Sequence, residues 1–419
     1  MCAKRVNEIK SLFVDENTET HVHTYPKICI EEKYEALKTL NFAINLTQKQ
    51  VYIHQHYRTL FNNTNINLTH AYEHAQQQTH LFTPLFQQLK PAGFTIPSYG
   101  CANMTNVETM LMLVEAFRFD ASFGTELVVH NSLTMRPIYD CGTDKQKEKY
   151  LPKMANYELM GAFGLTEPEI GSDAANLLTT ATPVQGGWLL NGKKRWIGGA
   201  ITAHVVLVWA RNEKTNNING FLVDTNTPGY STTKIENKFT LRIVQNANII
   251  LENCFVPEEN RFPTEGFGAT TKSLQSSRAM IAFGCTGLLL GAYERAVTYC
   301  TKRHQFNKPL VSFQLVQEKL MRVLASVQST MLTSLHIAKL MDCDEAEMKQ
   351  IALAKATCSR LCREGASLCR EVCGGNGVVA DYGVIISMLD AEGMYTYEGT
   401  YDINTLISAR SIFGVNAIR

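Results

Sequence analysis

The residues best suited to chemistry lie near the C-terminus, in the run Tyr395-Thr396-Tyr397-Glu398-Gly399-Thr400-Tyr401-Asp402. Its glutamate, Glu398, stands among aromatic residues and is followed at once by glycine. A carboxylate that is partly removed from water has its charged form disfavoured, so its pKa rises and it becomes a better proton acceptor. Gly399 has no Cβ and would let the backbone approach a flat ligand closely. The run indicates a general base beside a ligand; the alternative is a helix cap with surface tyrosines.

Two motifs in the middle of the chain are suited to holding a ligand. Residues 163–173 (FGLTEPEIGSD) are rich in glycine, hydroxyl groups and backbone N–H groups, which can bind a phosphate or the edge of a polar ring. Residues 194–199 (KRWIGG) place Trp196 where it could cover one side of a ring system. Each motif alone also fits an ordinary turn or a core tryptophan.

Two further motifs lie in the C-terminal third. Arg303, in the run KRHQF at residues 302–306, is either a solvated cation at a helix end or a phosphate clamp, for which its planar fork is suited. Residues 373–377 (CGGNG) hold more glycine than one helix cap requires, which suggests close backbone approach. No Gly-x-Gly-x-x-Gly opens a βαβ unit and no phosphate-binding lysine loop is present, so Rossmann and P-loop sites are excluded.

Composition narrows the class of protein. The 419 residues are enough for two or three folded units. Forty basic and 39 acidic residues leave a net charge of +1, so no bulk field indicates nucleic acid or an anionic membrane as partner. The apolar uncharged run from Ala279 to Tyr293 is shorter than the ~20 residues of a membrane helix. We expect a soluble globular protein without a transmembrane segment.

The cysteines and histidines do not predict a metal site. Four of the 12 cysteines recur at helical spacing along one stripe, as buried thiols do: Cys358, Cys362, Cys369 and Cys373. Two histidine pairs, His21 with His23 and His54 with His56, have polar neighbours and no acidic or cysteine partner at ligand spacing, so we expect surface positions. We therefore expect no metal.

Hydrophobic periodicity predicts the order α, then β, then α. Helices are expected at Gln48–Asn62, Thr69–Leu89 and Val107–Phe117. Asn191-Gly192 predicts a two-residue hairpin turn between strands at 188–190 and 193–197. Further short strands are expected at 205–210, 220–223, 231–235 and 248–251. Later helices are expected at 276–302, 312–341, 344–373, 382–395 and 403–413.

The predicted fold class is α+β. It has an N-terminal extension (1–45), an N-terminal α-helical domain (46–158), a middle antiparallel β-domain (159–272) and a C-terminal four-helix-type bundle (273–419).

Together the motifs resemble a family. Residues 163–173, 187–197, 303–306, 374–377 and 397–402 appear in the order and spacing of the acyl-CoA dehydrogenase and acyl-CoA oxidase superfamily, over residues 46–415. The runs KRWIG at 194–198, LRIVQN at 241–246, FVPEE at 255–259 and YEGTYDINTL at 397–406 look most like plant peroxisomal short-chain acyl-CoA oxidases. Glutaryl-CoA dehydrogenases come next in similarity.

The resemblance implies a flavin enzyme of fatty-acid β-oxidation type. Glu398 matches the catalytic base, which removes the α-proton of a short-chain acyl-CoA while the β-hydrogen leaves as hydride to flavin N5, giving a trans-2-enoyl-CoA. In the family, the backbone N–H of this base and a ribityl hydroxyl of FAD polarise the thioester carbonyl. The remaining alternatives are a glutaryl-CoA dehydrogenase-like enzyme and a silent structural subunit on the same fold.

The resemblance also assigns binding residues. Positions that match FAD contacts are Phe163, Leu165, Thr166, Ser172, Trp196, Gly198, Arg303, Phe306, Gln314, Gly374, Gly375, Thr400 and Asp402. Of these, Arg303, Phe306, Gln314, Gly374 and Gly375 correspond to positions that reach the FAD of a neighbouring subunit, which implies a homo-oligomer, usually a dimer of dimers. Positions expected beside the acyl-CoA are Arg118, Ser172, Arg278 and Gly399.

Two departures bear on specificity. One branch of the family carries its base on the helix that begins here near Ser276, but this sequence offers Ser277-Arg278 and no acid, so Glu398 has no competitor. Many dehydrogenases have threonine where this chain has Gly198, and the plant oxidase-like relatives share the glycine. This favours molecular oxygen over an electron-transfer flavoprotein as acceptor without deciding between them.

Targeting signals leave the compartment open between peroxisome and mitochondrial matrix. The first 45 residues carry too many acids for an ordinary mitochondrial presequence. Residues 5–13 resemble an N-terminal peroxisomal address, but Leu12 stands where that signal has His or Gln, and the C-terminus lacks a Ser-Lys-Leu-type address.

Overall fold

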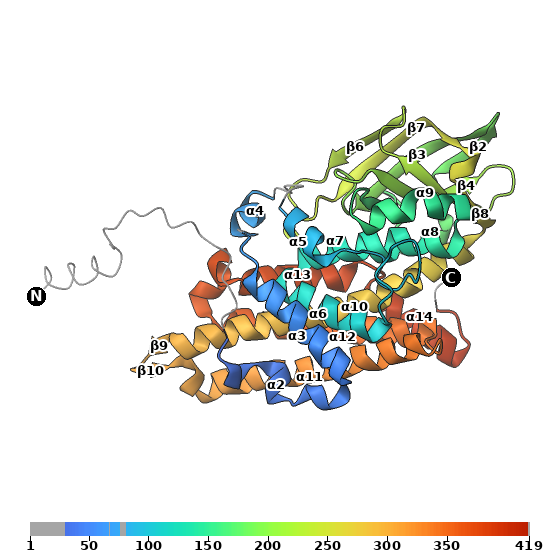
Figure 1. Ribbon diagram of the computed structural model, residues 1–419. Coiled ribbons are helices and arrows are strands. Elements are labelled where there is room, and N and C mark those ends of the chain that lie inside the picture. The colour runs from blue at the N-terminus through green and yellow to red at the C-terminus, as the bar shows by residue number, and fades with distance from the viewer. Residues whose placement is uncertain (1–29, 67, 76–80, 418–419) are drawn as a thin grey trace, which may run out of the picture.

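The computed structural model describes residues 30–66, 68–75 and 81–417 (Figure 1). The address-like segment at 5–13 and the pair His21 and His23 lie outside the described residues. The chain forms three parts in the order helical, β and helical. In space, the helical N-terminal part packs between the β-sheet domain and the C-terminal helical bundle (Figure 1). The predicted α+β class, with its helical, β and helical domains, is confirmed.

Local sequence signals define the N-terminal helices, which include α2 (Ala36–Thr39), α3 (Gln48–Asn63), α4 (Leu68–His74), α5 (Thr83–Leu89), α6 (Asn106–Phe119), α7 (Ala121–Val128), the π-helical turn η3 (Val129–Met135), α8 (Arg136–Cys141) and α9 (Asp144–Ala155). A capping box, in which a threonine and a residue three positions later each bond the other's backbone N–H, opens α3 at Thr47, α6 at Thr105 and α9 at Thr143. The single helix expected over Thr69–Leu89 is wrong, because the chain forms the separate helices α4 and α5 there.

The β-domain is one eight-stranded sheet with the order β6-β7-β3-β2-β4-β5-β8, and β1 pairs with β4 at its side. Its strands are β1 (Gly161–Gly164), β2 (Thr180–Val184), β3 (Gly187–Ile197), β4 (Val205–Asn212), β5 (Ile218–Asp224), β6 (Tyr230–Lys234), β7 (Ala247–Pro257) and β8 (Arg261–Glu265). The sheet is mainly antiparallel, as predicted, but β4 pairs in parallel with both β1 and β2. Its buried residues alternate with exposed ones along β7, as a strand with one covered face requires.

The predicted hairpin at Asn191-Gly192 is wrong. Strand β3 continues through this dipeptide and pairs along its length with β7, with a register irregularity between Leu190 and Gly192. A Cβ at Gly192 would lie 2.5 Å from Thr179 Oγ1, so the glycine allows close approach of the neighbouring chain. Asn-Gly is therefore accommodated as an irregularity within β3, because β7 pairs with β3 both before and after it.

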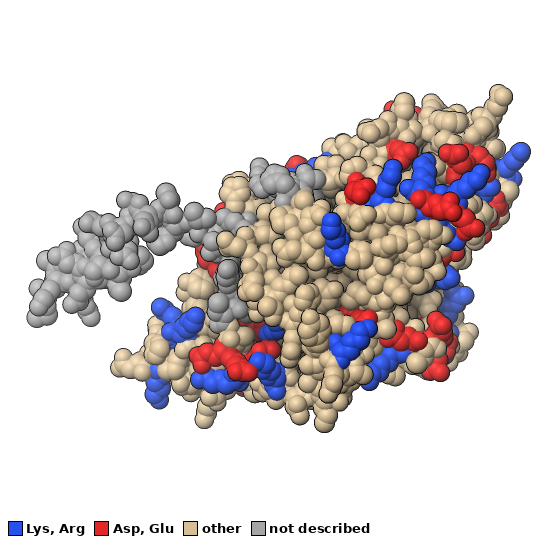
Figure 2. All heavy atoms as spheres, viewed as in Figure 1, with Lys and Arg blue, Asp and Glu red and all other residues tan. Residues whose placement is uncertain are grey.

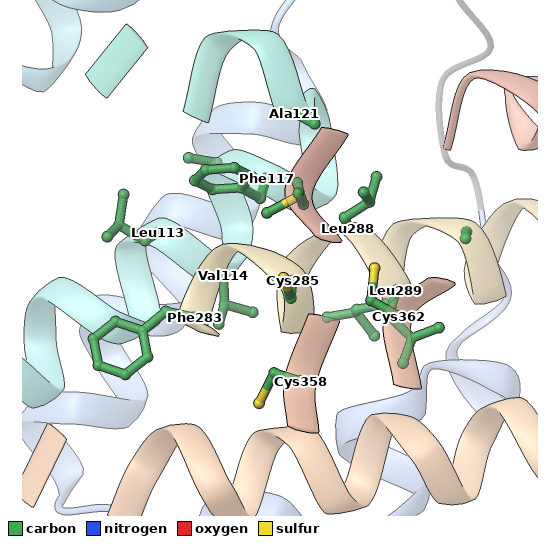
Figure 3. Close-up of a cluster of buried hydrophobic side chains, with 14 of the residues drawn as sticks. Leu113, Val114, Phe117, Ala121, Phe283, Cys285, Leu288, Leu289, Cys358 and Cys362 are labelled. Carbon is green, nitrogen blue, oxygen red and sulfur yellow. The ribbon is translucent and has the colours of Figure 1, made fainter. Parts of the chain in front are cut away.

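The C-terminal bundle is built from α10 (Phe267–Lys302), α11 (Gln314–Asp342), α12 (Met348–Val372), α13 (Val384–Thr396) and α14 (Tyr401–Phe413), with the small hairpin β9 (His304–Gln305) and β10 (Lys308–Pro309) between α10 and α11. Helix α10 begins ahead of the predicted domain boundary at 272. Figure 3 shows the interface of α6, α10 and α12, where Phe117, Leu288 and Cys362 share one buried cluster. A Cβ at Gly287 would lie 2.2 Å from the Val114 carbonyl oxygen, so glycine lets α10 approach α6 closely.

The cysteine stripe is buried, as predicted. Cys358, Cys362, Cys369 and Cys373 are free thiols inside the bundle. Burial raises the pKa of each thiol, which keeps them protonated and unreactive. Among the described residues, no group of three histidine, cysteine or acidic side chains is placed to hold a metal ion.

The molecular surface carries both signs of charge. On the face shown in Figure 2, lysine and arginine side chains mix with acidic ones over the β-domain and over the lower helices. Within the described part of the chain, no helix combines the length and apolar character that crossing a membrane requires.

Candidate active site

Glu398 lies in the short connection between α13 and α14. Its backbone has φ of 55°, and the next residue, Gly399, has φ of 81°. The left-handed region is sparsely populated by residues other than glycine, and such outliers gather at functional sites. At Gly399, an added Cβ would also lie 2.9 Å from Asn404 Nδ2. Glycine is therefore needed here by the backbone and by its neighbour.

The Glu398 carboxylate faces helix α10. Ser277 Oγ, which is fully buried, donates a hydrogen bond of 2.6 Å to Glu398 Oε2. Burial raises the pKa of Glu398, while Ser277 and the nearby cations Arg278 and Lys355 lower it in part. The position where one branch of the family carries its base thus holds a hydroxyl that orients Glu398.

Buried side chains from three helices collect the backbone carbonyl groups of this connection. Arg278 Nε from α10 donates to the Glu398 carbonyl at 3.2 Å, and Asn404 Nδ2 from α14 donates to the Gly399 carbonyl at 2.7 Å. Lys355 Nζ from α12 donates to the Gly399 carbonyl at 2.7 Å as well. The Thr400 hydroxyl accepts from Ile403 N and caps α14, which begins beside the exposed Asp402. The contact predicted between Arg278 and acyl-CoA stays a prediction.

The two middle-domain motifs come together. The Thr166 carbonyl accepts from Arg195 N at 2.8 Å, so the loop after β1 lies against the end of β3. Beneath the loop, the Glu167 carboxylate pairs with Lys194 Nζ at 2.8 Å and accepts from Thr179 N. Both ion-pair partners are buried, and their charges are satisfied by several hydrogen bonds. This arrangement fixes the loop that carries Phe163, Leu165, Thr166 and Ser172.

Trp196 and Gly198 end the strand beside that loop. Trp196 has φ of 65° and is 50% exposed, which is unusual for the largest side chain. A Cβ added at Gly198 would lie 3.5 Å from Val129 Cγ2, an ordinary contact, so packing does not demand glycine. Val129 follows α7, where Thr125 Oγ1 lies 3.3 Å from the hydroxyl of Tyr397. Helix α7 thus links the Gly198 region to the residue that precedes Glu398.

Three other residues predicted to bind the cofactor line a separate surface groove: Arg303, Gly374 and Gly375. The groove has a volume of about 560 Å³ and is also lined by the helices around them. A Cβ at Gly374 or Gly375 would meet nothing within 4 Å, so bare backbone faces open space. In Figure 1 the neighbouring hairpin β9–β10 and the strand β3 lie at opposite ends of the molecule.

Phe306 is the most conspicuous residue near this groove. It and Asn307 form the two-residue turn of the hairpin, with φ of 51° and 60°. Such turns normally take Asn-Gly, since both central residues need positive φ. Phe306 is 87% exposed, and Gln314 at the start of α11 is exposed as well. An aromatic ring held out at a turn suits contact with another molecule.

Arg118, predicted beside the acyl-CoA, is held in a buried ion-pair network, and its contact with substrate stays a prediction. Its Nε donates to Glu115 at 2.5 Å, its Nη1 to Glu294 at 3.1 Å and its Nη2 to Asn62 at 2.6 Å. The residue is 1% exposed, so its guanidinium presents no open face to a ligand. Arg58 pairs with the same two carboxylates, which makes this set a buried ion-pair network between α3, α6 and α10.

Sequence reasoning also misplaced or missed other polar residues. His54, expected at the surface, is part of the network, with Nε2 2.8 Å from Glu115. Lys355 and Asn404 were not singled out, although both hold the base. The available signal for Lys355 was a single lysine within the otherwise apolar stripe of α12. A lysine there has to be buried and needs acceptors, which only the folded chain reveals.

Comparisons with known proteins show which family this chain is similar to. Family models of the N-terminal, middle and C-terminal domains of acyl-CoA dehydrogenase match residues 47–158, 162–254 and 264–413. An acyl-CoA dehydrogenase of Bacillus subtilis is 34% identical over 328 residues, covering 77% of this chain and 86% of the relative. The mitochondrial short-chain specific acyl-CoA dehydrogenase of Rattus norvegicus is 32% identical over 328 residues, 77% of each chain.

A solved structure extends the match to the whole fold. A glutaryl-CoA dehydrogenase from Mycobacterium smegmatis, in complex with FADH2, superposes with a TM-score of 0.89 and 32% identity, covering 92% of this chain and 100% of that one. The predicted superfamily is therefore confirmed, and the chain belongs to the acyl-CoA dehydrogenase family.

Proposed function

We propose that the protein is an FAD-dependent acyl-CoA oxidoreductase that converts a short-chain acyl-CoA into a trans-2-enoyl-CoA, with Glu398 as base. The observation that carries this proposal is the Glu398 carboxylate itself. It is oriented by Ser277 at 2.6 Å, and it belongs to a residue in the left-handed region that side chains of three helices brace. A structural subunit without turnover has no physical need for this arrangement.

The residues present fit an FAD. Trp196 is half exposed at the end of β3, and the adjoining loop holds Thr166 and Ser172 above the Glu167–Lys194 pair. We assign the flavin ring to this loop and to Trp196, which can cover one face of it. FAD supplies the acceptor for the hydride that leaves the β-carbon of the substrate.

The phosphates and adenine end require a second set of residues. Arg303 and the bare backbone of Gly374 and Gly375 line a groove that can hold a phosphate by charge and by close approach. In Figure 1 the hairpin β9–β10 beside this groove and the strand β3 lie at opposite ends of the molecule, which favours a cofactor shared between subunits. We propose that each FAD bridges two copies in a homo-oligomer, with Phe306 and Gln314 reaching the neighbouring site.

The chain's own residues account for the proton step. Burial raises the pKa of Glu398, which makes its carboxylate a stronger base toward the weakly acidic α-proton of a thioester. Ser277 points one carboxylate oxygen and leaves the other available to the substrate. We assign the backbone N–H of Glu398 to the thioester carbonyl, which it polarises as proton removal develops negative charge there. Tyr397 and Thr125 wall the site on the α7 side.

The electron acceptor is proposed to be molecular oxygen. The support for this proposal is Gly198. A side chain could be accommodated at this position without a clash, but the chain has glycine there, beside Trp196. An open position at the flavin edge eases approach of a small oxidant. Anaerobic reduction with butyryl-CoA followed by air tests it: fast recolouring with stoichiometric peroxide supports an oxidase. Flavin that stays reduced until an electron-transfer flavoprotein is added would make the protein a dehydrogenase.

Glu398→Gln tests the base. The amide is nearly isosteric but does not accept the α-proton, so the variant should keep its yellow colour and lose anaerobic bleaching by butyryl-CoA by at least about a thousandfold. Glu392→Gln, an exposed acid on α13, is the matched control and should bleach normally. Normal bleaching in Glu398→Gln would remove the residue from its role, and a chain that cannot be loaded with FAD would exclude the enzyme.

A further inference from the structure

The connection that carries Glu398 needs support from outside itself. A glutamate in the left-handed region lies above the usual backbone energy minimum, so the surrounding structure must favour that conformation. The connection runs between two helices and contains backbone carbonyl groups that helix bonds do not use. Whichever side chain binds those carbonyls on both sides of Glu398 decides where the carboxylate points.

Lys355 has this position. It lies on α12, it is fully buried, and its Nζ is 2.7 Å from the Gly399 carbonyl oxygen and 3.4 Å from the Tyr395 carbonyl oxygen. These two acceptors flank Glu398 in the sequence. Arg278 and Asn404 bind the Glu398 and Gly399 carbonyls. Lys355 also binds the Tyr395 carbonyl, which precedes the base in the sequence.

A buried cation beside the base also acts through its charge. The charged groups near Glu398 are Arg278 on α10 and Lys355 on α12, and both favour its carboxylate form against the effect of burial. Arg278 faces Lys355 too, as does the thiol of Cys285. Burial lowers the pKa of Lys355 to about 8, so the ammonium is charged at neutral pH and loses its charge as the pH rises further.

We propose that Lys355 is a positioning residue for the base: it holds the Glu398 connection in its left-handed conformation and keeps the carboxylate ionised. This proposal rests on the proposed function, since it concerns the same proton transfer. It assigns to α12 a part in the reaction that lies outside the substrate and cofactor contacts. Lys355 touches neither reacting group directly.

The test is the pH dependence of anaerobic flavin reduction by butyryl-CoA in the FAD-loaded protein. The second-order rate constant reports ionisations of the free enzyme. In Lys355→Met, which keeps the length but removes the charge, the acid limb should move to higher pH by about one unit or more, with about a tenfold lower rate at pH values well below the wild-type midpoint. Lys349→Met, a partly exposed lysine on the same helix, is the matched control.

Lys355→Arg provides the second measurement. Arginine keeps the charge and the N–H donors, so the acid limb of this variant should stay at the wild-type pH. If Lys355→Met does not fold, Lys355→Gln, which also removes the charge, takes its place. A wild-type acid limb in the uncharged variant, or an acid limb in Lys355→Arg that shifts as far as in the uncharged variant, would overturn the proposal.

Failure of the two proposals can be told apart. If the wild type bleaches and Glu398→Gln does not, the enzyme is established whatever Lys355 does. If Glu398→Gln bleaches normally, the proposed function falls first, and the role of Lys355 falls with it.

Discussion

Replacing Arg118 by methionine separates a structural role from a substrate role. Arg118 donates to Glu115, Glu294 and Asn62, and both carboxylates are fully buried. Methionine fills much of the same volume but leaves these acceptors with one cation fewer. We therefore expect a large loss of stability with little change in the kinetics of the folded fraction.

The loss of unfolding free energy in Arg118→Met depends on which ion pairs remain in the network. Removing one partner of a buried ion pair typically costs about 3–5 kcal/mol, because the other charge is left buried. Here Arg58 still pairs with both Glu115 and Glu294, and His54 still contacts Glu115. The loss should therefore lie near the lower limit, at about 3 kcal/mol.

Urea unfolding of the FAD-loaded protein measures it. Large chains often unfold in steps, so the informative quantity is the shift of the main transition relative to a surface control. Arg322→Met is that control, since its pair with Glu318 is exposed and should contribute less than about 1 kcal/mol. A wild-type midpoint in Arg118→Met, together with a selective loss of turnover on glutaryl-CoA against butyryl-CoA, would refute the structural role.

Two further predictions concern the flavin edge and the junction between domains. Gly198→Thr should fold, since its Cβ meets Val129 and Val244 at ordinary distances, and the added hydroxyl should slow oxygen-dependent recolouring about threefold to tenfold. Stopped-flow reoxidation measures this, and an unchanged rate would contradict it. Asp390 accepts from Leu241 N, and burial raises its pKa to about 7, so it holds its proton in the folded chain at pH values where the unfolded chain releases it. Wild-type stability should thus fall as pH rises from about 4 to 7 relative to Asp390→Asn, by on the order of 4 kcal/mol. Urea midpoints of both proteins at pH 5 and pH 8 test this, and a constant difference would count against it.

Local signals in the sequence predicted the helices well. Hydrophobic periodicity placed α3 and α6 within a residue or two of their observed ends. Asn191-Gly192 failed as a hairpin signal because β7 pairs across it, a partner more than 50 residues away. Turn preference is a local property, and a long neighbouring strand overrides it.

In the candidate site, too, residues signalled by their sequence neighbours could be predicted, and residues that depend on distant contacts could not. Glu398 was identifiable because its unusual neighbours adjoin it in the sequence. Ser277 on α10 bonds the Glu398 carboxylate across 121 residues, and Lys355 on α12 bonds the neighbouring Gly399 carbonyl across 44 residues, so only the fold brings them there. For Arg118 the sequence did not reveal the buried partner Glu294, because an arginine at the end of an apolar helix looks the same whether its partner is a ligand or a carboxylate.

The rate at which the buried thiols are labelled reports how often the helical bundle opens. Cys358, Cys362 and Cys369 are buried, so we expect them to react with a thiol reagent only when the bundle opens around α12, whereas Cys343 at the end of α11 is exposed and should react at once. Labelling of the buried cysteines should therefore form a slow phase, and its rate should report the opening of α12, which bears Lys355, from α10, which bears Ser277. Any ligand that clasps Glu398 should slow that phase, which makes ligand binding visible in the timing of cysteine modification without any change in colour.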